Sequence, residues 1–194
     1  MIKLFILLAI GCYTNSEQFH SFSSLDINGN KLKLEDLAGK VVLIVNVASE
    51  CGYTDSHYTA LQQLYQLLKP TGRFTILGYP CNQFGAQEPG SRHQIKEFIK
   101  QYSVSFNIMD KVEVVGKNAD PVWKYLVQSS GMSPKWNFYK YLVGGEGEVL
   151  QVWGPDVPVH DILDVVQAAV DHLDQPQVQM ERPLSAEEIA HDEL

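Results

Sequence analysis

The chain has 194 residues, a length that suits one domain and is enough to bury a core without disulfide or metal staples. Hydrophobic residues make up 45% and charged residues 20%, the ordinary composition of a soluble globular protein. The net charge is −8 and no stripe of Lys and Arg occurs, so the composition argues against a surface that binds nucleic acid.

The N-terminus has the pattern of a secretory signal peptide. Lys3 gives a short positive start, an unbroken apolar run covers residues 4–10, and small or polar residues follow from Gly11. The run is too short to span a bilayer, which takes about 20 residues, so we expect no stable membrane span. We predict a signal peptide over residues 1–16, with a buried N-terminal strand as the alternative.

Strands and helices are predicted to alternate along residues 19–173. Asn28-Gly29 predicts a hairpin over residues 25–32, and the apolar, β-branched residues 41–48 predict a central strand covered on both faces. Apolar residues at helical spacing predict a helix over residues 54–68. In chain order, the further predictions are strands over 74–78, 112–115, 136–143 and 148–153, and helices over 91–102 (with Ser91 as N-cap), 120–129 and 159–173.

This order of elements predicts the fold class. Strands that alternate with helices imply a largely parallel sheet, which here ends in an antiparallel hairpin and a closing helix. We predict an α/β protein with a thioredoxin-like fold, in which helices flank both faces of a central mixed β-sheet. A single domain over residues 19–173 would hold this fold.

The C-terminal residues 174–194 form an acidic, polar tail with six acidic residues and one basic residue. The chain ends in His191-Asp192-Glu193-Leu194, the sequence of an endoplasmic-reticulum retrieval signal. Together with the predicted leader, it predicts residence in the endoplasmic-reticulum lumen. Residues 9–12 faintly resemble the cleavage site of a bacterial lipoprotein, but the C-terminal signal argues against that interpretation.

Cysteine usage fits this compartment. The chain has three cysteines, of which Cys12 lies in or beside the predicted leader. The mature chain would keep Cys51 and Cys81, in a compartment where disulfides can form.

Cys51 is the first candidate for chemistry. It follows the predicted central strand and precedes a predicted helix, and ligands of open α/β sheets bind at the carboxyl ends of the strands. A helix N-terminus favours the thiolate, which is the reactive form of cysteine. Glu50 would oppose this effect if its carboxylate lay close. The alternative is a buried, inert cysteine.

Two further segments carry polar side chains that could act with Cys51. Residues 78–90 follow the next strand and bring three amides and Cys81 to the same edge of the sheet, although a polar turn would explain the same pattern. Trp136 and Asn137 offer N–H donors, which could stabilise the charge on the oxygen that leaves when a thiolate attacks a peroxide. A core role for Trp136 is the alternative.

Three segments of the sequence resemble the signatures of the glutathione peroxidase family, in the family's order. They are residues 46–54 (NVASECGYT), 80–89 (PCNQFGAQEP) and 136–138 (WNF), and the resemblance covers about residues 19–173. It is strongest to the cysteine-containing members of the endoplasmic reticulum. The resemblance implies that Cys51 is the peroxidatic residue and that Gln87, Trp136 and Asn137 are its hydrogen-bonding partners.

The sequence also departs from the family members that use glutathione well. Those members recruit glutathione with arginines, whereas this chain has only Arg73, Arg92 and Arg182. It also lacks the long insertion of the tetrameric members between Gly131 and Trp136. These differences imply a monomer with an open site that uses glutathione weakly.

Residues 103–115 contain no cysteine, although thioredoxin-using members carry their resolving cysteine in that region. Cys81 is then the remaining intramolecular candidate for the resolving residue. The mechanism that follows is attack of Cys51 on hydrogen peroxide or an organic or lipid hydroperoxide, which forms a sulfenic acid. That acid would condense with Cys81 or with a partner thiol, for which protein disulfide isomerase is the natural candidate in this compartment.

Other functions have weaker support. A peroxide sensor that forms mixed disulfides with partners but turns over little would share Cys51. A dithiol oxidoreductase would need a Cys-x-x-Cys motif, which is absent. The six histidines are scattered and no phosphate-binding glycine loop occurs, so we expect neither a metal nor another cofactor.

Overall fold

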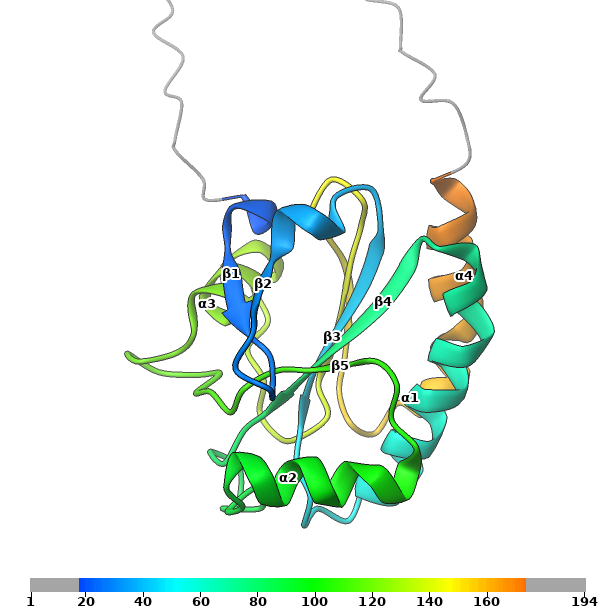
Figure 1. Ribbon diagram of the computed structural model, residues 1–194. Coiled ribbons are helices and arrows are strands. Elements are labelled where there is room, and N and C mark those ends of the chain that lie inside the picture. Colours follow the sequence, from blue (N-terminus) through cyan, green and yellow to red (C-terminus); the bar gives the residue numbers. More distant parts are fainter. Residues whose placement is uncertain (1–17, 174–194) are drawn as a thin grey trace, which may run out of the picture.

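The computed structural model describes residues 18–173. The predicted leader (1–16) and the acidic tail (174–194) lie outside these residues and stay predictions. A five-stranded mixed sheet runs through the molecule in the order β5-β4-β3-β6-β7 (Figure 1). Its parallel part consists of β3 (Val41–Val47), β4 (Phe74–Pro80) and β5 (Asn107–Ile108), and its antiparallel part of β6 (Lys140–Val143) and β7 (Val149–Trp153).

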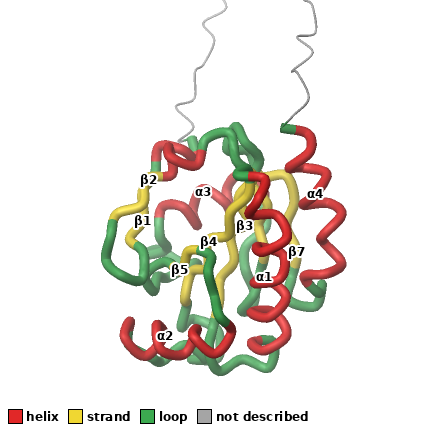
Figure 2. Tube along the Cα trace, turned by 45° about the vertical axis from the view of Figure 1, so that its right-hand side comes forward, coloured by secondary structure: helices red, strands yellow, loops and turns green. Residues whose placement is uncertain are grey.

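Helices cover both faces of this sheet, as predicted (Figures 1 and 2). Alternate residues of β3 point to opposite faces. Leu43 and Val45 belong to the hydrophobic cluster under α1 (Thr54–Leu68), α2 (Arg92–Phe98) and α4 (Leu163–His172). Val42 and Ile44 belong to the cluster under α3 (Pro121–Ser130), on the side of the hairpin β1 (Ser23–Leu25) and β2 (Lys31–Lys33). We call these the α1 face and the α3 face.

The helices lie close to their predicted positions. Helix α1 has the predicted bounds, and α2 begins after Ser91, whose side chain accepts from the N–H of Gln94 in a capping box, as expected for this N-cap. A 3₁₀ turn (Ile99–Tyr102) continues α2, and another (Val159–Ile162) precedes α4. No helix in residues 18–173 is long and apolar enough to cross a membrane.

The strand predicted over residues 112–115 is wrong. The backbone N–H groups of Val114 and Val115 both donate to Oε1 of Gln83, at 2.7 and 3.0 Å, so a loop side chain takes the place of a neighbouring strand. The third parallel strand is instead β5, which pairs with Leu77 and Gly78 of β4.

The strand predicted over residues 136–143 begins only at Lys140. Residues 136–138 form a turn in which Phe138 adopts a φ of +64°, a backbone conformation that residues other than glycine rarely adopt. Asn46 of β3 holds this turn, because its carbonyl accepts from the N–H of Phe138 at 2.7 Å and its Oδ1 accepts from the N–H of Tyr139 at 2.9 Å. The Trp-Asn-Phe segment therefore forms a turn before β6 instead of lying in the sheet.

Candidate active site

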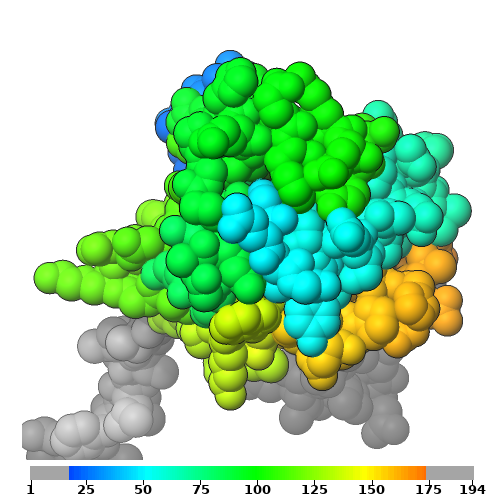
Figure 3. Space-filling view, turned by 90° about the horizontal axis from the view of Figure 1, so that it is seen from below, coloured from blue at the N-terminus to red at the C-terminus, as the bar shows by residue number. Residues whose placement is uncertain are grey.

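Three segments meet at the carboxyl end of β3 and β4: the turn after β3, the loop after β4, and the turn before β6. The N–H of Glu50 donates to the carbonyl of Gln87 at 3.0 Å, which ties the first segment to the second. Nδ2 of Asn46 donates to the carbonyl of Trp136 at 3.0 Å, which ties β3 to the third. Seen from below, the cyan segment after β3 lies between the green segments and the yellow-green segment before β6 (Figure 3).

Cys51 lies in the turn between β3 and α1 and is 8% exposed. Its N–H donates to Oγ1 of Thr54 at 3.0 Å, and this hydroxyl donates to the carbonyl of Ala48 at 2.8 Å. The N–H of Thr54, the first residue of α1, donates in turn to the Cys51 carbonyl at 3.0 Å. The thiol therefore sits in a fixed turn directly before a helix N-terminus, where the sequence predicted it.

Gln87 and Asn137 come together next to this turn. Asn137 is completely buried, and its Nδ2 donates to Oε1 of Gln87 at 2.8 Å and to the carbonyl of Phe84 at 3.3 Å. Because Oε1 of Gln87 is the acceptor, its Nε2 is left as a donor, and it has no hydrogen bond within the described part of the chain. The half-buried Gln87 amide is thus held in one orientation with its N–H groups available.

Trp136 lies against the same loop and is 38% exposed. Its ring centroid is 6.4 Å from that of Phe84. Gly85 has a φ of +66°, and a Cβ atom there would lie 3.3 Å from the Trp136 ring and 3.4 Å from the Gln87 side chain. Glycine therefore allows the loop to approach both side chains. The structure brings all four predicted residues, Cys51, Gln87, Trp136 and Asn137, to this edge of the sheet.

Cys81, the suggested resolving residue, lies elsewhere. It is completely buried in the cluster of the α3 face, whereas Cys51 packs in the cluster of the α1 face. Its Sγ is 3.6 Å from Oε1 of Gln83. Burial raises the pKa of the Cys81 thiol, which favours the unreactive protonated form. Both cysteines are free thiols.

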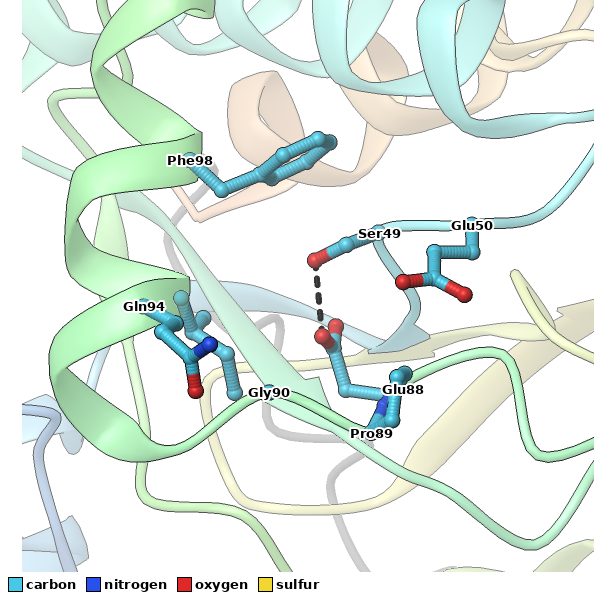
Figure 4. A pocket seen from close by; sticks show the side chains of 8 residues that line it. Ser49, Glu50, Glu88, Pro89, Gly90, Gln94 and Phe98 are labelled. Carbon is cyan, nitrogen blue, oxygen red and sulfur yellow. Dashed lines mark hydrogen bonds between the residues drawn. The ribbon is translucent and has the colours of Figure 1, made fainter.

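A hollow of about 260 Å³ adjoins the Cys51 turn, between that turn and α2 (Figure 4). The completely buried Glu88 lies in its wall, and Oε1 of Glu88 accepts from Oγ of Ser49 at 2.7 Å. Burial raises the pKa of Glu88 to about 7, and Oε2 has no hydrogen bond to any described residue. This residue was not predicted from the sequence, because an acidic side chain in a polar loop is normally exposed.

A buried polar pair on the α1 face was not predicted either. His57 of α1 and Lys140 of β6 are both buried, and Nε2 of His57 lies 3.4 Å from Nζ of Lys140. A lysine directly before the apolar residues 141–143 was the signal that could have drawn attention to it.

Comparisons with known proteins agree with this architecture. A sequence model described as glutathione peroxidase matches residues 19–127. Glutathione peroxidase 7 of Bos taurus is 46% identical over 169 residues, which cover 87% of this chain and 90% of the relative.

Solved structures agree as well. The crystal structure of Trgpx in apo form has a TM-score of 0.67 and 34% identity, and the match covers 83% of this chain and 98% of that one. A thioredoxin family thiol:disulfide interchange protein from Chlorobium tepidum TLS, at 18% identity and a TM-score of 0.59 over 77% of this chain and 92% of that one, shares the fold. The predicted thioredoxin-like fold is thus confirmed, and the chain belongs to the glutathione peroxidase family of peroxidases.

Proposed function

We propose that this peroxidase uses the Cys51 thiolate to reduce hydrogen peroxide and organic or lipid hydroperoxides. The observation that carries the proposal is the 2.8 Å hydrogen bond from Asn137 to Gln87. It orients the Gln87 amide, whose own backbone carbonyl is bound by the residue before Cys51. The two N–H groups of this amide would then be available next to the Cys51 turn, where we propose that a peroxide is cleaved.

In the reaction, the Cys51 sulfur attacks one peroxide oxygen and the O–O bond breaks. The sulfur loses two electrons and becomes a sulfenic acid, and the departing oxygen takes up a proton and leaves as water or an alcohol. Negative charge develops on that departing oxygen. Nε2 of Gln87 and Nε1 of Trp136 would donate to it, and Asn137 would keep Gln87 in place.

We propose that a lumenal dithiol protein of the protein disulfide isomerase type regenerates Cys51. A partner thiol would attack the sulfenic acid to form a mixed disulfide and water, and the second partner thiol would then release Cys51. The burial of Cys81 on the α3 face supports direct attack by the partner over an intramolecular disulfide. Glutathione would be a weaker reductant, because arginines are few and Arg92 is paired with Asp110.

We also propose that the enzyme is a monomer of the endoplasmic-reticulum lumen. The apolar leader and the terminal His-Asp-Glu-Leu support the endoplasmic-reticulum lumen, where dithiol proteins are the available partners. The short segment between Gly131 and Trp136 supports a monomer whose Cys51 turn is open to a large partner.

The test is steady-state consumption of hydrogen peroxide with glutathione, thioredoxin and protein disulfide isomerase side by side. We expect the fastest turnover with protein disulfide isomerase and none in a Cys51→Ser variant. Oxidation of Cys51 in a single turnover, but no turnover above the uncatalysed rate with any of these reductants, would favour a peroxide sensor or redox relay instead.

A further inference from the structure

Strand β6 begins with a lysine that has no exposed surface. Lys140 is completely buried, although the residues that follow it in β6 are apolar. Moving an ammonium group out of water is unfavourable unless its N–H groups are hydrogen-bonded. The acceptors of Lys140 therefore show what this side chain holds in place.

The Lys140 ammonium has three acceptors, one for each of its N–H groups. Nζ donates to the carbonyl of Phe138 at 3.0 Å and to the carbonyl of Gly154 at 2.7 Å. The third neighbour is Nε2 of His57, at 3.4 Å.

The other side of the imidazole fixes its protonation. Nδ1 of His57 lies 3.1 Å from the carbonyl of Tyr53, which can only accept, and 3.3 Å from Oγ of Ser56, which itself donates to that carbonyl at 3.1 Å. We therefore assign the hydrogen to Nδ1. Nε2 is then the acceptor for Lys140. Burial and then the charge of Lys140 lower the pKa of His57 to about 4, which agrees with a neutral ring.

These hydrogen bonds connect the turn that carries Cys51 with the turn that carries Trp136 and Asn137. Tyr53 follows Cys51 by two residues in the turn before α1, and Phe138 follows Asn137 directly. A continuous path thus runs from the Tyr53 carbonyl through His57 and Lys140 to the Phe138 carbonyl. At Phe138 the path ends on the residue with the strained φ of +64°, a conformation that needs support from its surroundings.

We propose that His57 and Lys140 form a positioning pair that keeps Trp136 and Asn137 in place relative to Cys51 while the thiolate attacks a peroxide. The inference rests on the proposed role of Cys51. Neither side chain has to touch the peroxide, because each hydrogen-bonds a backbone carbonyl, one two residues after Cys51 and the other one residue after Asn137. Small displacements of a catalytic group reduce rates strongly, so loss of the pair should slow oxidation of Cys51 by about 10- to 100-fold.

The experiment compares two reactions of Cys51 in the full chain, wild type and Lys140→Met. The first is single-turnover oxidation by hydrogen peroxide, which uses the donors of Gln87 and Trp136. The second is alkylation by iodoacetamide at its alkaline plateau, which needs the thiolate but no donor to a leaving oxygen. We expect Lys140→Met to slow oxidation by about 10- to 100-fold and to leave the alkylation plateau unchanged.

Tyr141→Phe is the matched control. Tyr141 is the next residue of β6 and packs on the α3 face, and the variant removes its partly buried hydrogen bond from Oη to the carbonyl of Met132, at 2.7 Å. The proposal expects normal oxidation of Cys51 in this variant. Equal oxidation rates in wild type and Lys140→Met, or equal losses in Lys140→Met and Tyr141→Phe, would overturn it.

His57→Phe answers the same question if Lys140→Met does not fold. Phenylalanine keeps a ring against Phe138, whose centroid lies 4.9 Å from that of His57, but breaks the hydrogen-bonded path. We expect the same selective loss of oxidation, and an unchanged ratio of oxidation to alkylation would overturn the proposal. If wild-type Cys51 itself is not oxidised by peroxide, the proposed function fails, which is a separate and recognisable result.

The ratio of the two rates also carries a pH signature. Burial lowers the pKa of Lys140 to about 8, against the opposing effect of the Asp156 carboxylate. Above that pH the amine keeps only two of its three N–H groups, so we expect the ratio to fall in the wild type above about pH 8. In Lys140→Met the ratio should not change over this range, and the same fall in both proteins would count against the proposal.

Discussion

Cys51 and Cys81 follow neighbouring parallel strands, yet their surroundings differ in almost every respect. The turn of Cys51 is tied to Gln87 by the Glu50 N–H and precedes α1. Cys81 is still bound to β3, because its N–H donates to the Val47 carbonyl at 3.0 Å, and its side chain is sealed in the α3 face.

This difference shows that a place at the carboxyl end of a strand does not by itself make a thiol reactive. A strand sends successive side chains to opposite faces, so the position at which the chain leaves the sheet decides where a cysteine points. Cys81 follows the alternation of Tyr79 and stays in the core. Cys51 lies beyond the end of β3, in the turn before α1, and keeps 8% of its surface exposed.

The largest expected effect comes from removing the Cys51 thiol. Cys51→Ser should reduce peroxide consumption to the uncatalysed level, a loss on the order of 10³-fold or more, because no other described thiol lies in the polar turn. The measurement is stopped-flow consumption of hydrogen peroxide. Substantial activity in this variant would place the chemistry on another residue.

Gln87 and Gln83 lie in the same loop after β4, and their variants compare the surroundings of Cys51 with those of Cys81. Gln87→Ala should slow oxidation of Cys51 by about 10²-fold, since it removes a donor to the leaving oxygen. Gln83→Ala is the control on the Cys81 side, where Gln83 binds the backbone of Val114 and Val115. It should lower the free energy of unfolding by about 1–3 kcal/mol while single-turnover oxidation stays normal. Equal kinetic effects would contradict the assignment of Gln87.

Glu88 predicts a pH dependence of stability on the Cys51 side. Its pKa is raised from 4.5 to about 7, so between these values the folded state binds more protons than the unfolded state, and Glu88 lowers stability as the pH rises. Relative to wild type, Glu88→Gln should therefore gain roughly 2–3 kcal/mol of unfolding free energy between pH 5 and pH 8.

Urea unfolding at both pH values measures this effect. Glu113→Gln is the control, because Glu113 is an exposed acid near Cys81. It removes a carboxylate from the exposed surface, so a gain specific to the buried Glu88 should exceed the change in this variant. A Glu88→Gln variant with the wild-type pH dependence would contradict the raised pKa.

The smallest effect is expected for Cys81→Ser. A buried thiol on the opposite face should not contribute to the peroxide step, so oxidation of Cys51 should keep the wild-type rate. Turnover with protein disulfide isomerase should also be retained. A variant that is oxidised normally but no longer turns over would show that Cys81 resolves Cys51 after a rearrangement.

Much of the fold followed from local patterns. The continuous apolar run of β3 and the helical spacing of apolar residues in α1 follow from which side chains are buried, and this pattern can be read from the sequence. The strand predicted over residues 112–115 failed because the side chain of Gln83, distant in the sequence, binds the N–H groups of Val114 and Val115. No local pattern contains such a contact.

The site was predictable in composition but not in arrangement. Cys51, Gln87, Trp136 and Asn137 were identified mainly through the family resemblance, and the structure brings them to one edge of the sheet. The turn at Phe138, the burial of Lys140 and the face occupied by Cys81 depend on contacts between segments far apart in the sequence. Pattern and spacing could therefore not distinguish Cys81 from a second active-site thiol.

The proposed function depends on Cys51 as the thiol that peroxide oxidises. The most direct test treats the reduced protein with one equivalent of hydrogen peroxide in the presence of dimedone, which traps sulfenic acids, and maps the adduct by mass spectrometry. We expect the adduct on Cys51 and none on Cys81. An adduct on Cys81, or an unmodified Cys51 after the peroxide has been consumed, would contradict the claim.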